Sequence, residues 1–453
     1  MKQKTLVWFR QDLRLADNPA LHEAVKNGSI MAIYILDDKT PGEFKMGEAS
    51  RWYLHYSLAS LNKSLDNQLN FYCGDALTII LELVKKHNIT AVYWNRCYEP
   101  WRIKADAALK SKLAICKSFN GSLLWEPWQV LKNDGTPYKV FTPYYKNGCL
   151  QKAPPRIILA KPKKINLIKD DHGLNLDDLK LLPIMKFSWK VGEAAAHKKL
   201  NKFLKNNLET YKENRDFPAK QSTSYLSPCL HFGELSPNQI WYGTPHEGAD
   251  FLRQLVWREF SYYLLYHFPT LPVDNFQKKF NVFSWRKSAK NLKAWQQGKT
   301  GYPLIDAGMR ELWQTGYMHN RVRMVVGSFL VKNLLIHWHE GEAWFWDCLV
   351  DADLANNSAS WQWVAGTGAD AAPYFRIFNP ITQGEKFDKE GEYTRHFVPE
   401  LRDLPNRYLF KPWLAPEAVL KSAGIELGIT YPKPIVDLSF SRKRALEAYA
   451  KSR

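Results

Sequence analysis

Aromatic side chains are the most unusual feature of this sequence. It contains 18 Trp, 22 Tyr and 23 Phe, and several of the tryptophans gather between Gly301 and Asp388. Such rings can build large hydrophobic cores, but they also stack on planar ligands and can pass electrons from one ring to the next. The chemistry to look for is therefore base stacking or electron transfer, and the alternative is an aromatic-rich core.

The balance of charge indicates a polyanionic partner. Lys and Arg number 63 against 45 Asp and Glu, which gives a net charge of +18. Neutralisation of phosphates by basic side chains drives nucleic-acid binding, so a nucleic acid is the expected partner, although solubility explains part of the charge. The six scattered cysteines contain no C-x-x-C pair, so neither a zinc ribbon nor a dithiol redox motif is indicated.

The same survey predicts a soluble protein of the cytoplasm. Sparse cysteine use fits a reducing compartment. The N-terminus, MKQKTLVWFRQDLRL, meets charge too soon for a signal peptide. No apolar run approaches the roughly 20 residues that a membrane-spanning helix needs. We expect no membrane association, no obligate protein partner and a monomer.

Two apparent ligand motifs lack the sequence context that ligand binding would need. Gly366–Ala371 (GTGADA) matches G-x-G-x-x-A, but a dinucleotide fingerprint needs a preceding strand and a following helix, and Pro373 follows closely. His337 and His339, followed by Glu340, resemble a metal cluster. On a helix, residues two apart do not share a face, so packing or surface histidines are the better interpretation and no metal is expected.

The elements that must position these residues change character along the chain. The N-terminal part alternates short apolar runs, typical of buried strands, with amphipathic stretches typical of helices. This alternation predicts a doubly wound, Rossmann-like α/β domain with a parallel sheet, whose ligands lie at the carboxyl ends of the strands. The expected strands are Thr5–Phe9, Met31–Leu36, Asn70–Cys73 and Ala91–Trp94, and the expected helices are Asn18–Asn27, Glu48–Asp66, Ala76–His87 and Arg102–Phe119.

Two further regions follow this domain. The sequence from about residue 131 to 190 is irregular and largely basic, with Pro154–Pro155 and Lys161–Lys164, and predicts a connecting segment. From about residue 191 the pattern is helical, and the apolar residues of Val322–Leu335 mark one helix face. We therefore expect an α/β domain over 1–130, a connecting segment over 131–190 and an all-α domain over 191–453.

The photolyase/cryptochrome family has a flavin-binding core that resembles Gly301–Asp388, which reads GYPLIDAGMRELWQTGYMHNRVRMVVGSFLVKNLLIHWHEGEAWFWDCLVDADLANNSASWQWVAGTGADAAPYFRIFNPITQGEKFD. The family's opening signature resembles Trp8–Leu21, WFRQDLRLADNPAL. The resemblance covers essentially the whole chain and is nearest to bacterial photolyases for cyclobutane pyrimidine dimers. It implies a FAD-binding all-α domain. It also implies a reduced flavin that gives an electron to damaged bases and recovers it, with the protein supplying position and electrostatics.

The resemblance implies a set of flavin contacts. Thr223–Ser227 (TSYLS) resembles a phosphate cradle, since hydroxyls and N–H groups at a helix start can hold a diphosphate; a plain helix cap is the alternative. Arg323 would pair with Asp351 and favour anionic reduced flavin, and the Asn357 amide would face flavin N5. The expected contacts are Tyr211, Thr223, Ser224, Tyr225, Leu226, Ser227, Phe251, Arg258, Arg323, Asp351, Ala352, Asp353 and Asn357.

Three tryptophans match the family's electron-transfer chain. The resemblance places Trp361 beside the flavin, Trp338 in the middle and Trp285 near solvent. Electron hopping needs closely spaced oxidisable rings that lead outward from a buried cofactor. Each tryptophan alone would be read as a core residue, but all three are in register with the family. With Asn357 and Gln254, they are the expected catalytic residues.

A different set of residues matches the side that holds damaged DNA. Trp257 and Trp363 resemble the aromatic walls around a flipped dinucleotide. Stacking on such rings is worth roughly 1–3 kcal/mol per base, and extrusion costs least for damaged bases. The expected pocket residues are Gln254, Trp257, Asn320, Arg321, Met324 and Trp363, and the expected phosphate contacts are Arg215 and Arg376.

The lesion-side pattern departs from the family at one informative position. Repair enzymes for cyclobutane dimers usually carry a glutamate where this chain has Gln254, which can hydrogen-bond a pyrimidine but cannot ionise. Enzymes for the (6-4) photoproduct often have glutamine there, but they also have two histidines where this chain has Asn320 and Met324. Cyclobutane dimers are the favoured lesion. Phe251 replaces a tryptophan common in one branch.

A light-harvesting antenna is also implied. Trp94–Asp106 (WNRCYEPWRIKAD) resembles the antenna-binding loop of folate-using bacterial branches, and Glu99 matches an acidic residue that could bond a pterin. We expect 5,10-methenyltetrahydrofolate, with 8-hydroxy-5-deazaflavin as the alternative. An aromatic loop at the start of a helix is the structural alternative.

The expected function is light-driven repair of UV-damaged DNA by a deoxyribodipyrimidine photo-lyase. A cryptochrome-type photoreceptor and (6-4) repair are the alternatives. The sequence ends shortly after the helical region, without the long tail of many receptors, and it retains both Trp257 and Trp363. Both features favour repair. A flavoprotein that only binds nucleic acid is a weaker third interpretation, because passive binding needs no tryptophan chain.

Overall fold

The computed structural model describes residues 3–452 and divides the chain into two compact units. Unit 1 comprises Met1–Glu209, Ser224–Thr270 and Val350–Asn356. Unit 2 comprises Thr210–Thr223, Leu271–Leu349 and Asn357–Arg453. Each unit is therefore assembled from separate stretches of sequence. The domain boundaries expected near residues 130 and 190 stay a prediction.

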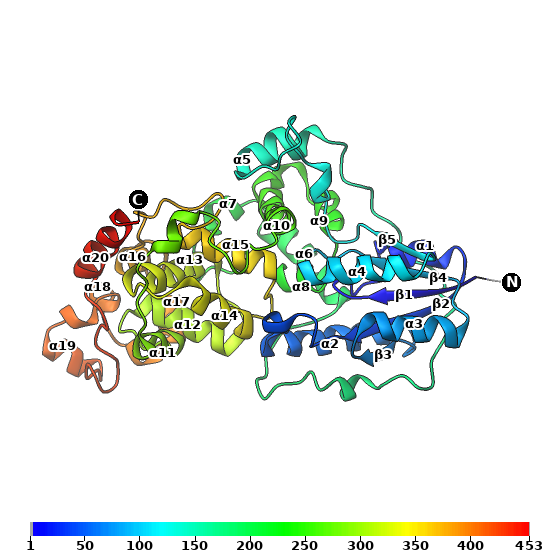
Figure 1. Cartoon of the computed structure of the whole chain (residues 1–453). Helices are drawn as coiled ribbons and strands as arrows, with labels where there is room; N and C mark the ends of the chain where they lie inside the picture. The colour runs from blue at the N-terminus through cyan, green and yellow to red at the C-terminus, as the bar shows by residue number, and fades with distance from the viewer. Residues whose placement is uncertain (1–2, 453) are drawn as a thin grey trace. The chain divides into compact units, whose positions relative to one another are not determined.

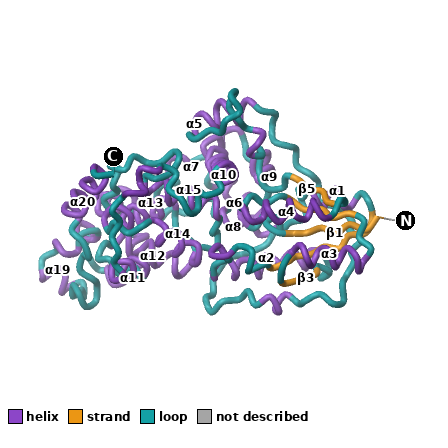
Figure 2. The backbone as a smooth tube through the Cα atoms, in the orientation of Figure 1, coloured by secondary structure: helices purple, strands orange, loops and turns teal. Residues whose placement is uncertain are grey.

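Unit 1 contains a five-stranded parallel sheet in the order β3-β2-β1-β4-β5 (Figures 1 and 2). Because the chain leaves β1 toward β2 and later returns to β1's other side at β4, the strand order reverses between β1 and β4. In such sheets this reversal creates a crevice at the carboxyl ends of the strands. The strands are β1 (Gln3–Phe9), β2 (Gly28–Leu36), β3 (Asn70–Cys73), β4 (Ala91–Asn95) and β5 (Cys116–Phe119).

Alternate residues of each strand feed two separate cores. Val7 and Phe9 of β1 pack with helices α1 (Pro19–Val25) and α2 (Glu48–Ser64). Leu6 and Trp8 face the other way, toward α3 (Ala76–His87) and α4 (Pro100–Lys112). Burial on both faces explains why these strands read as continuous apolar runs. The predicted doubly wound α/β architecture is confirmed.

One predicted helix was wrong at its end. The helix expected over Arg102–Phe119 stops at Lys112, and Cys116–Phe119 forms the edge strand β5, paired with β4. No residue of β5 is fully buried and it has only four residues. A short edge strand with one neighbour carries neither an apolar run nor a clear alternation, so its sequence, CKSF, gave no strand signal.

The predicted connecting segment packs onto unit 1 rather than crossing open solvent. Its residues Leu167 and Leu174 form isolated bridges with Ile30 and Phe71 of the sheet. Leu181 and Phe187 enter the same core as α1 and α2. The segment also contains the short α5 (Phe141–Pro143), a π-helical turn (Tyr144–Gly148) and 3-10 turns at Cys149–Gln151 and Leu176–Leu179.

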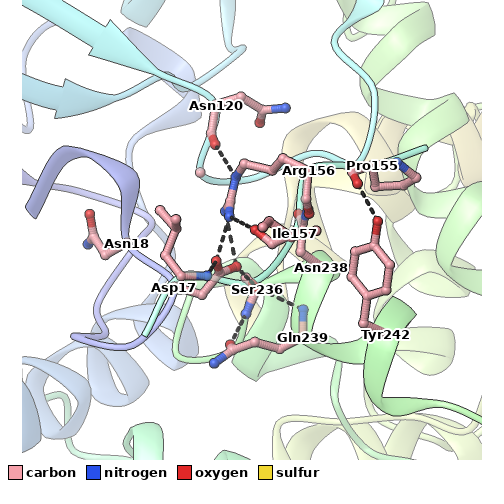
Figure 3. A network of polar contacts seen from close by, with 12 residues as sticks. Asp17, Asn18, Asn120, Pro155, Arg156, Ile157, Ser236, Asn238, Gln239 and Tyr242 are labelled. Atoms are coloured by element: carbon pink, nitrogen blue, oxygen red, sulfur yellow. Dashed lines mark hydrogen bonds and ion pairs between the residues drawn. The ribbon is translucent and has the colours of Figure 1, made fainter. Parts of the chain in front are cut away.

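A buried polar network ties this segment to the loop after β1 (Figure 3). The Arg156 guanidinium bonds Asp17, with Nη2 3.0 Å from Oδ2, and the backbone N–H of Leu159 donates to Asp17 at 2.8 Å. Ser236 donates its hydroxyl to Asp17 and caps helix α9 (Pro237–Gly243). Asp17 is fully buried, so these donors provide the partners that a buried carboxylate requires.

The remaining helices of unit 1 lie around residues 193 to 267 in the sequence. They are α6 (Glu193–Asn206), α8 (Ser227–His231), α9 and the 19-residue α10 (Ala249–His267). Helix α10 carries several of the expected site residues, including Gln254, Trp257 and Arg258. The first turn of α15 (Leu354–Ala365) also belongs to unit 1.

Unit 2 is helical, as predicted for the C-terminal region, and all five strands of the described chain lie in unit 1. The helix expected over Val322–Leu335 is interrupted: α13 ends at Ser328, a π-helical turn covers Phe329–Asn333, and Leu335 has a φ of +56°. The helices of unit 2 are α7 (Tyr211–Asn214), α11 (Ala289–Gln296), α12 (Pro303–Thr315), α13 (Asn320–Ser328), α14 (Trp338–Cys348), most of α15, α16 (Pro380–Phe387), α17 (Glu392–Phe397), α18 (Asn406–Leu409), α19 (Glu417–Ser422) and α20 (Leu438–Ala450).

Over residues 3–452, no helix is both long enough and apolar enough to cross a bilayer.

Candidate active site

Trp361 packs directly on the backbone of a neighbouring helix in unit 2. It is 3% exposed, and its ring meets Phe345 and Trp295 edge-on at centroid distances of 5.0 and 6.2 Å. Gly341 of α14 has no room for a side chain, because a Cβ there would lie 2.1 Å from an indole carbon of Trp361. Trp361 therefore lies against the first turn of the helix that begins with Trp338.

Trp338 and Trp285 continue from this contact toward the surface. Trp338 is fully buried, and its Nε1 donates to Asn275 Oδ1 at 2.9 Å. Trp285 is half-buried and packs against Phe283 at a centroid distance of 4.5 Å. Of the three tryptophans, Trp285 alone is not fully buried. Trp285 is therefore the most exposed of the three rings, and the order of electron transfer stays a prediction.

The His337 ring lies against both of the outer tryptophans. Its centroid is 5.0 Å from that of Trp285 and 5.6 Å from that of Trp338. The rings of Trp285, His337 and Trp338 are thus in contact, and Trp361 packs on the same helix α14 at Gly341. We call these four side chains the tryptophan route (Trp361, Trp338, His337 and Trp285).

Two expected flavin contacts of unit 2 are held in place by backbone carbonyls. Asn357 precedes Trp361 by one turn on the same face of α15, and its Nδ2 donates to Glu342 O at 3.0 Å. Arg323 Nε donates to Met318 O at 2.7 Å, and its guanidinium lies over the Tyr317 ring. Asp351, the expected partner of Arg323, belongs to unit 1, so that ion pair stays a prediction.

Asp353 is the centre of a hydrogen-bonded cluster in unit 1. It accepts from the Asn356 backbone N–H at 2.9 Å and from the Tyr262 hydroxyl, and its Oδ2 lies 3.2 Å from His231 Nδ1. Burial would raise its pKa, but the contacts with His231, Arg258 and Tyr262 outweigh burial and hold the pKa of Asp353 well below its usual range. Asp353 is therefore a carboxylate at neutral pH, available as an acceptor.

The TSYLS segment does not behave as an ordinary helix cap. Helix α8 begins at Ser227, its N-cap is Leu226, and no side chain caps its first turn. The Ser227 hydroxyl instead donates to Asp351 Oδ2 at 2.6 Å. Tyr225 has a φ of +51°, a left-handed conformation that is uncommon for a non-glycine residue and often marks a functional loop.

The other expected flavin contacts have ordinary structural surroundings. Phe251 is 7% exposed and packs on Phe203, and Arg258 donates to Ser122 O at 3.1 Å while covering the Tyr262 ring. The side chains of Tyr211, Leu226 and Ala352 are buried.

On the lesion side, α10 presents Gln254 and Trp257 one turn apart in unit 1. Both side chains are half-buried, and Gln254 Nε2 donates to Asp250 O at 3.3 Å. The Trp257 ring stacks face to face on Phe141, with centroids 3.7 Å apart and planes 6° apart. Phe141 comes from the connecting segment and is 1% exposed. It therefore covers one face of the Trp257 indole.

The lesion-side residues of unit 2 are spread over α13 and three other segments. Asn320 Nδ2 lies 3.9 Å from Met324 Sδ, so these two expected pocket residues touch. Arg321 is ion-paired to Asp216 at 2.8 Å. The other three residues are Trp363, which is half-buried, Arg215, whose guanidinium lies over Tyr211, and Arg376, which is exposed.

Glu99 lies at the strand-order reversal of the sheet. It follows β4, and its Oε1 accepts from Nε2 of Gln11, which follows β1, at 2.7 Å. Its second oxygen, Oε2, is buried without a hydrogen-bond partner among the described residues. A buried carboxylate oxygen without a donor is costly, so this position is suited to a ligand that donates a hydrogen bond.

Comparison with known families assigns both parts of the chain. Residues 5–162 match the family model described as DNA photolyase, and residues 251–451 match the model described as FAD binding domain of DNA photolyase. The chain belongs to the DNA photolyase/cryptochrome family. FAD is therefore the cofactor of this fold, as the sequence resemblance implied.

Individual relatives include members of both branches of the family. The chain is 48% identical to the deoxyribodipyrimidine photo-lyase of Agrobacterium fabrum, over 98% of this chain and 97% of that protein. The crystal structure of a bacterial class III photolyase from Agrobacterium tumefaciens matches with a TM-score of 0.95 and 47% identity, covering 100% of this chain and 98% of that one. Cryptochrome-2 of Arabidopsis thaliana is 38% identical over 100% of this chain and 80% of that protein.

The TSYLS segment offers a polar atom that fits a flavin diphosphate. Thr223 Oγ1 is buried and has no hydrogen-bond partner within the described part of the chain. This orphaned hydroxyl begins the TSYLS segment, where the family pattern puts the phosphates. An unsatisfied buried hydroxyl costs about 1–3 kcal/mol, which a phosphate oxygen would offset.

Sequence reasoning missed two residues that contact the expected site residues. Phe141 falls in the segment interpreted only as a connector, and nothing local indicates that it meets Trp257. His337 was interpreted as a packing or surface histidine. Its position directly before Trp338 was the available signal, because a residue that caps a helix lies beside the helix's first side chain.

Proposed function

We propose that this chain is a light-driven DNA repair enzyme that splits cyclobutane pyrimidine dimers. The light-driven part is supported by the packing of Trp361 on the turn of α14 that begins with Trp338. A buried ring that packs on the helix carrying the next oxidisable ring is suited to electron supply. Repair is supported by the near full-length similarity to a photo-lyase.

Each part of the chain has a defined task in this proposal. Reduced FAD, when bound, supplies the electron that splits the dimer and takes it back afterwards. Asn357 donates one N–H to Glu342 O, which fixes the amide, and its carbonyl oxygen can accept a hydrogen bond from the cofactor. The tryptophan route delivers electrons from the surface inward. The anionic Asp353 can accept a hydrogen bond from the cofactor, and Arg323 can face it with a positive charge.

The lesion preference is part of the same proposal. Gln254 lies one turn from Trp257, so its amide can bond a pyrimidine stacked on that ring, although it can deliver no proton. Asn320 and Met324 stand where enzymes for the (6-4) photoproduct carry histidines. Without an ionisable group at any of these three positions, proton-assisted (6-4) chemistry is disfavoured, and cyclobutane dimers are the proposed substrate.

The direct test is a repair assay on purified holoprotein. With FAD reduced and blue light applied, oligonucleotides that contain a thymine dimer should yield thymine monomers, whereas the dark sample should yield none. The same assay on DNA with a (6-4) photoproduct should give no repair. Chromatography of the digested oligonucleotide measures both. Repair of the (6-4) lesion alone would overturn the assignment based on Asn320 and Met324.

A photoreceptor without repair activity is the second candidate, favoured by the 38% identity to a plant cryptochrome over the whole chain. The assay separates the two functions. If FAD photoreduction is normal but no monomers form from either lesion, the receptor function is supported and the repair function is rejected.

We further propose that Glu99 binds an antenna chromophore, with 5,10-methenyltetrahydrofolate as the expected molecule and 8-hydroxy-5-deazaflavin as the alternative. The buried, unpartnered Oε2 at the strand-order reversal supports a ligand there. Mass spectrometry of the chromophores released from native protein should find folate beside FAD. A Glu99→Gln variant should lose the folate but keep FAD; retention of both in equal amounts would contradict the assignment.

A further inference from the structure

The histidine motif His337-x-His339 lies at the start of helix α14. Within the described ranges, no group of three or more His, Cys, Asp and Glu side chains is arranged to hold a metal ion. His337 is the N-cap of α14, and its Nδ1 accepts from the His339 backbone N–H at 3.2 Å. This bond fixes both the orientation of the imidazole and its tautomer, because an accepting Nδ1 leaves the proton on Nε2.

The fixed imidazole lies between two side chains of the tryptophan route. Its plane is within 27° of the Trp338 plane and crosses the Trp285 plane at 70°. The backbone holds Trp285 in this place, since Arg286 N donates to Leu335 O at 2.7 Å, two residues before His337. On both sides of the imidazole the contact is therefore from ring to ring.

The imidazole is also uncharged at neutral pH. Burial, with a smaller contribution from the neighbouring His339, lowers the pKa of His337 to about 4. A positive charge at this position would oppose the formation of a cationic hole on either adjacent indole. A neutral ring adds no such penalty.

We propose that His337 is a positioning residue of the electron supply, whose ring joins Trp285 to Trp338. This inference rests on the proposed use of these tryptophans in flavin photoreduction. Oxidised FAD, when bound, would supply the light-driven oxidation of Trp361, and Trp338 would then give an electron to Trp361. One electron would leave the Trp285 indole, cross the imidazole contact and reduce the Trp338 indole. No covalent bond forms or breaks. A thiol in solution then returns an electron to Trp285.

The chain offers two matched variants, because the cap and the ring of His337 can be removed separately. His337→Asn keeps a side-chain acceptor for the His339 N–H, and Asn is among the best N-caps, but it removes the aromatic ring. His337→Phe keeps a flat ring and removes the acceptor. The measurements are FAD photoreduction under blue light with dithiothreitol, the transient absorption of tryptophan radicals, and the thermal midpoint. Near-UV circular dichroism of the FAD-free protein reports the ring packing separately.

His337→Asn should photoreduce FAD severalfold more slowly, with a normal thermal midpoint and FAD content. His337→Phe should show a lower midpoint and near-normal photoreduction. When FAD is reduced chemically beforehand, both variants should repair dimers normally, because the route is then not needed. Normal photoreduction in His337→Asn, or an equal loss in both variants, would overturn the inference.

A Trp285→Phe variant separates this inference from the function on which it rests. If Trp285→Phe blocks photoreduction while His337→Asn does not, the tryptophans carry electrons and only the role of His337 is wrong. If Trp285→Phe photoreduces normally, the proposed use of the route fails, and the inference fails with it.

Discussion

Replacement of Trp361 by phenylalanine is expected to abolish light-driven reduction of bound FAD while FAD stays bound. Phenylalanine fills most of the same space against Gly341, Phe345 and Trp295, but its ring is much harder to oxidise than indole. The packing is therefore largely kept and the first electron donor is lost. The loss of the oxidised-flavin absorption bands under blue light, with a thiol present, measures the effect.

Trp295 provides the matched control for this variant. It also touches Trp361, but it is fully buried, and its Nε1 is committed to Val326 O at 3.1 Å. An electron taken from Trp295 could not be replaced quickly from solvent, so Trp295→Phe should photoreduce FAD at nearly the normal rate. Normal photoreduction of FAD in Trp361→Phe would show that Trp361 is not part of the tryptophan route. Loss of photoreduction in Trp295→Phe would show that Trp295 belongs to the route.

The architecture of the α/β part could be predicted because its strands are buried on both faces. Four strands were predicted from apolar runs such as TLVWF and AVYW, which are typical of a parallel sheet covered on both faces. Most helix limits were predicted from the amphipathic stretches between these runs. The edge strand β5 was not predicted, because half-buried residues with a single neighbouring strand show no clear hydrophobic pattern in the sequence. The π-helical turn at Phe329–Asn333 was not predicted, because its apolar residues keep the spacing of an α-helix although the backbone hydrogen bonds are those of a π-helix.

The candidate site was predictable where one element carries the residues in order. Asn357 and Trp361 share a face of α15, and Gln254 and Trp257 share a turn of α10, so spacing alone relates them. The contact between Phe141 and Trp257 has no such signal, since it depends on how a distant segment folds back. The same holds for Glu99 and Gln11, which only the topology of the sheet brings together.

Replacement of Trp257 by alanine should weaken binding of dimer-containing DNA. One stacked base contributes about 1–3 kcal/mol, which corresponds to roughly a 5- to 150-fold increase in Kd. The upper part of this range is expected, because Phe141 already holds the indole flat and little entropy is spent in fixing it when DNA binds. Fluorescence anisotropy with a dimer-containing duplex measures the affinity at fixed salt concentration.

Two comparisons show whether the loss comes from stacking in a pocket. Affinity for undamaged DNA should change little, because phosphate contacts by basic side chains dominate non-specific binding. Trp128, which is 42% exposed in the same unit, can be replaced by alanine as the control for removal of an accessible indole, and this variant should bind dimers normally. If Trp257→Ala weakens binding to damaged and undamaged DNA equally, the ring serves general DNA binding. Discrimination of the lesion would then lie with other residues, such as Trp363 and Gln254.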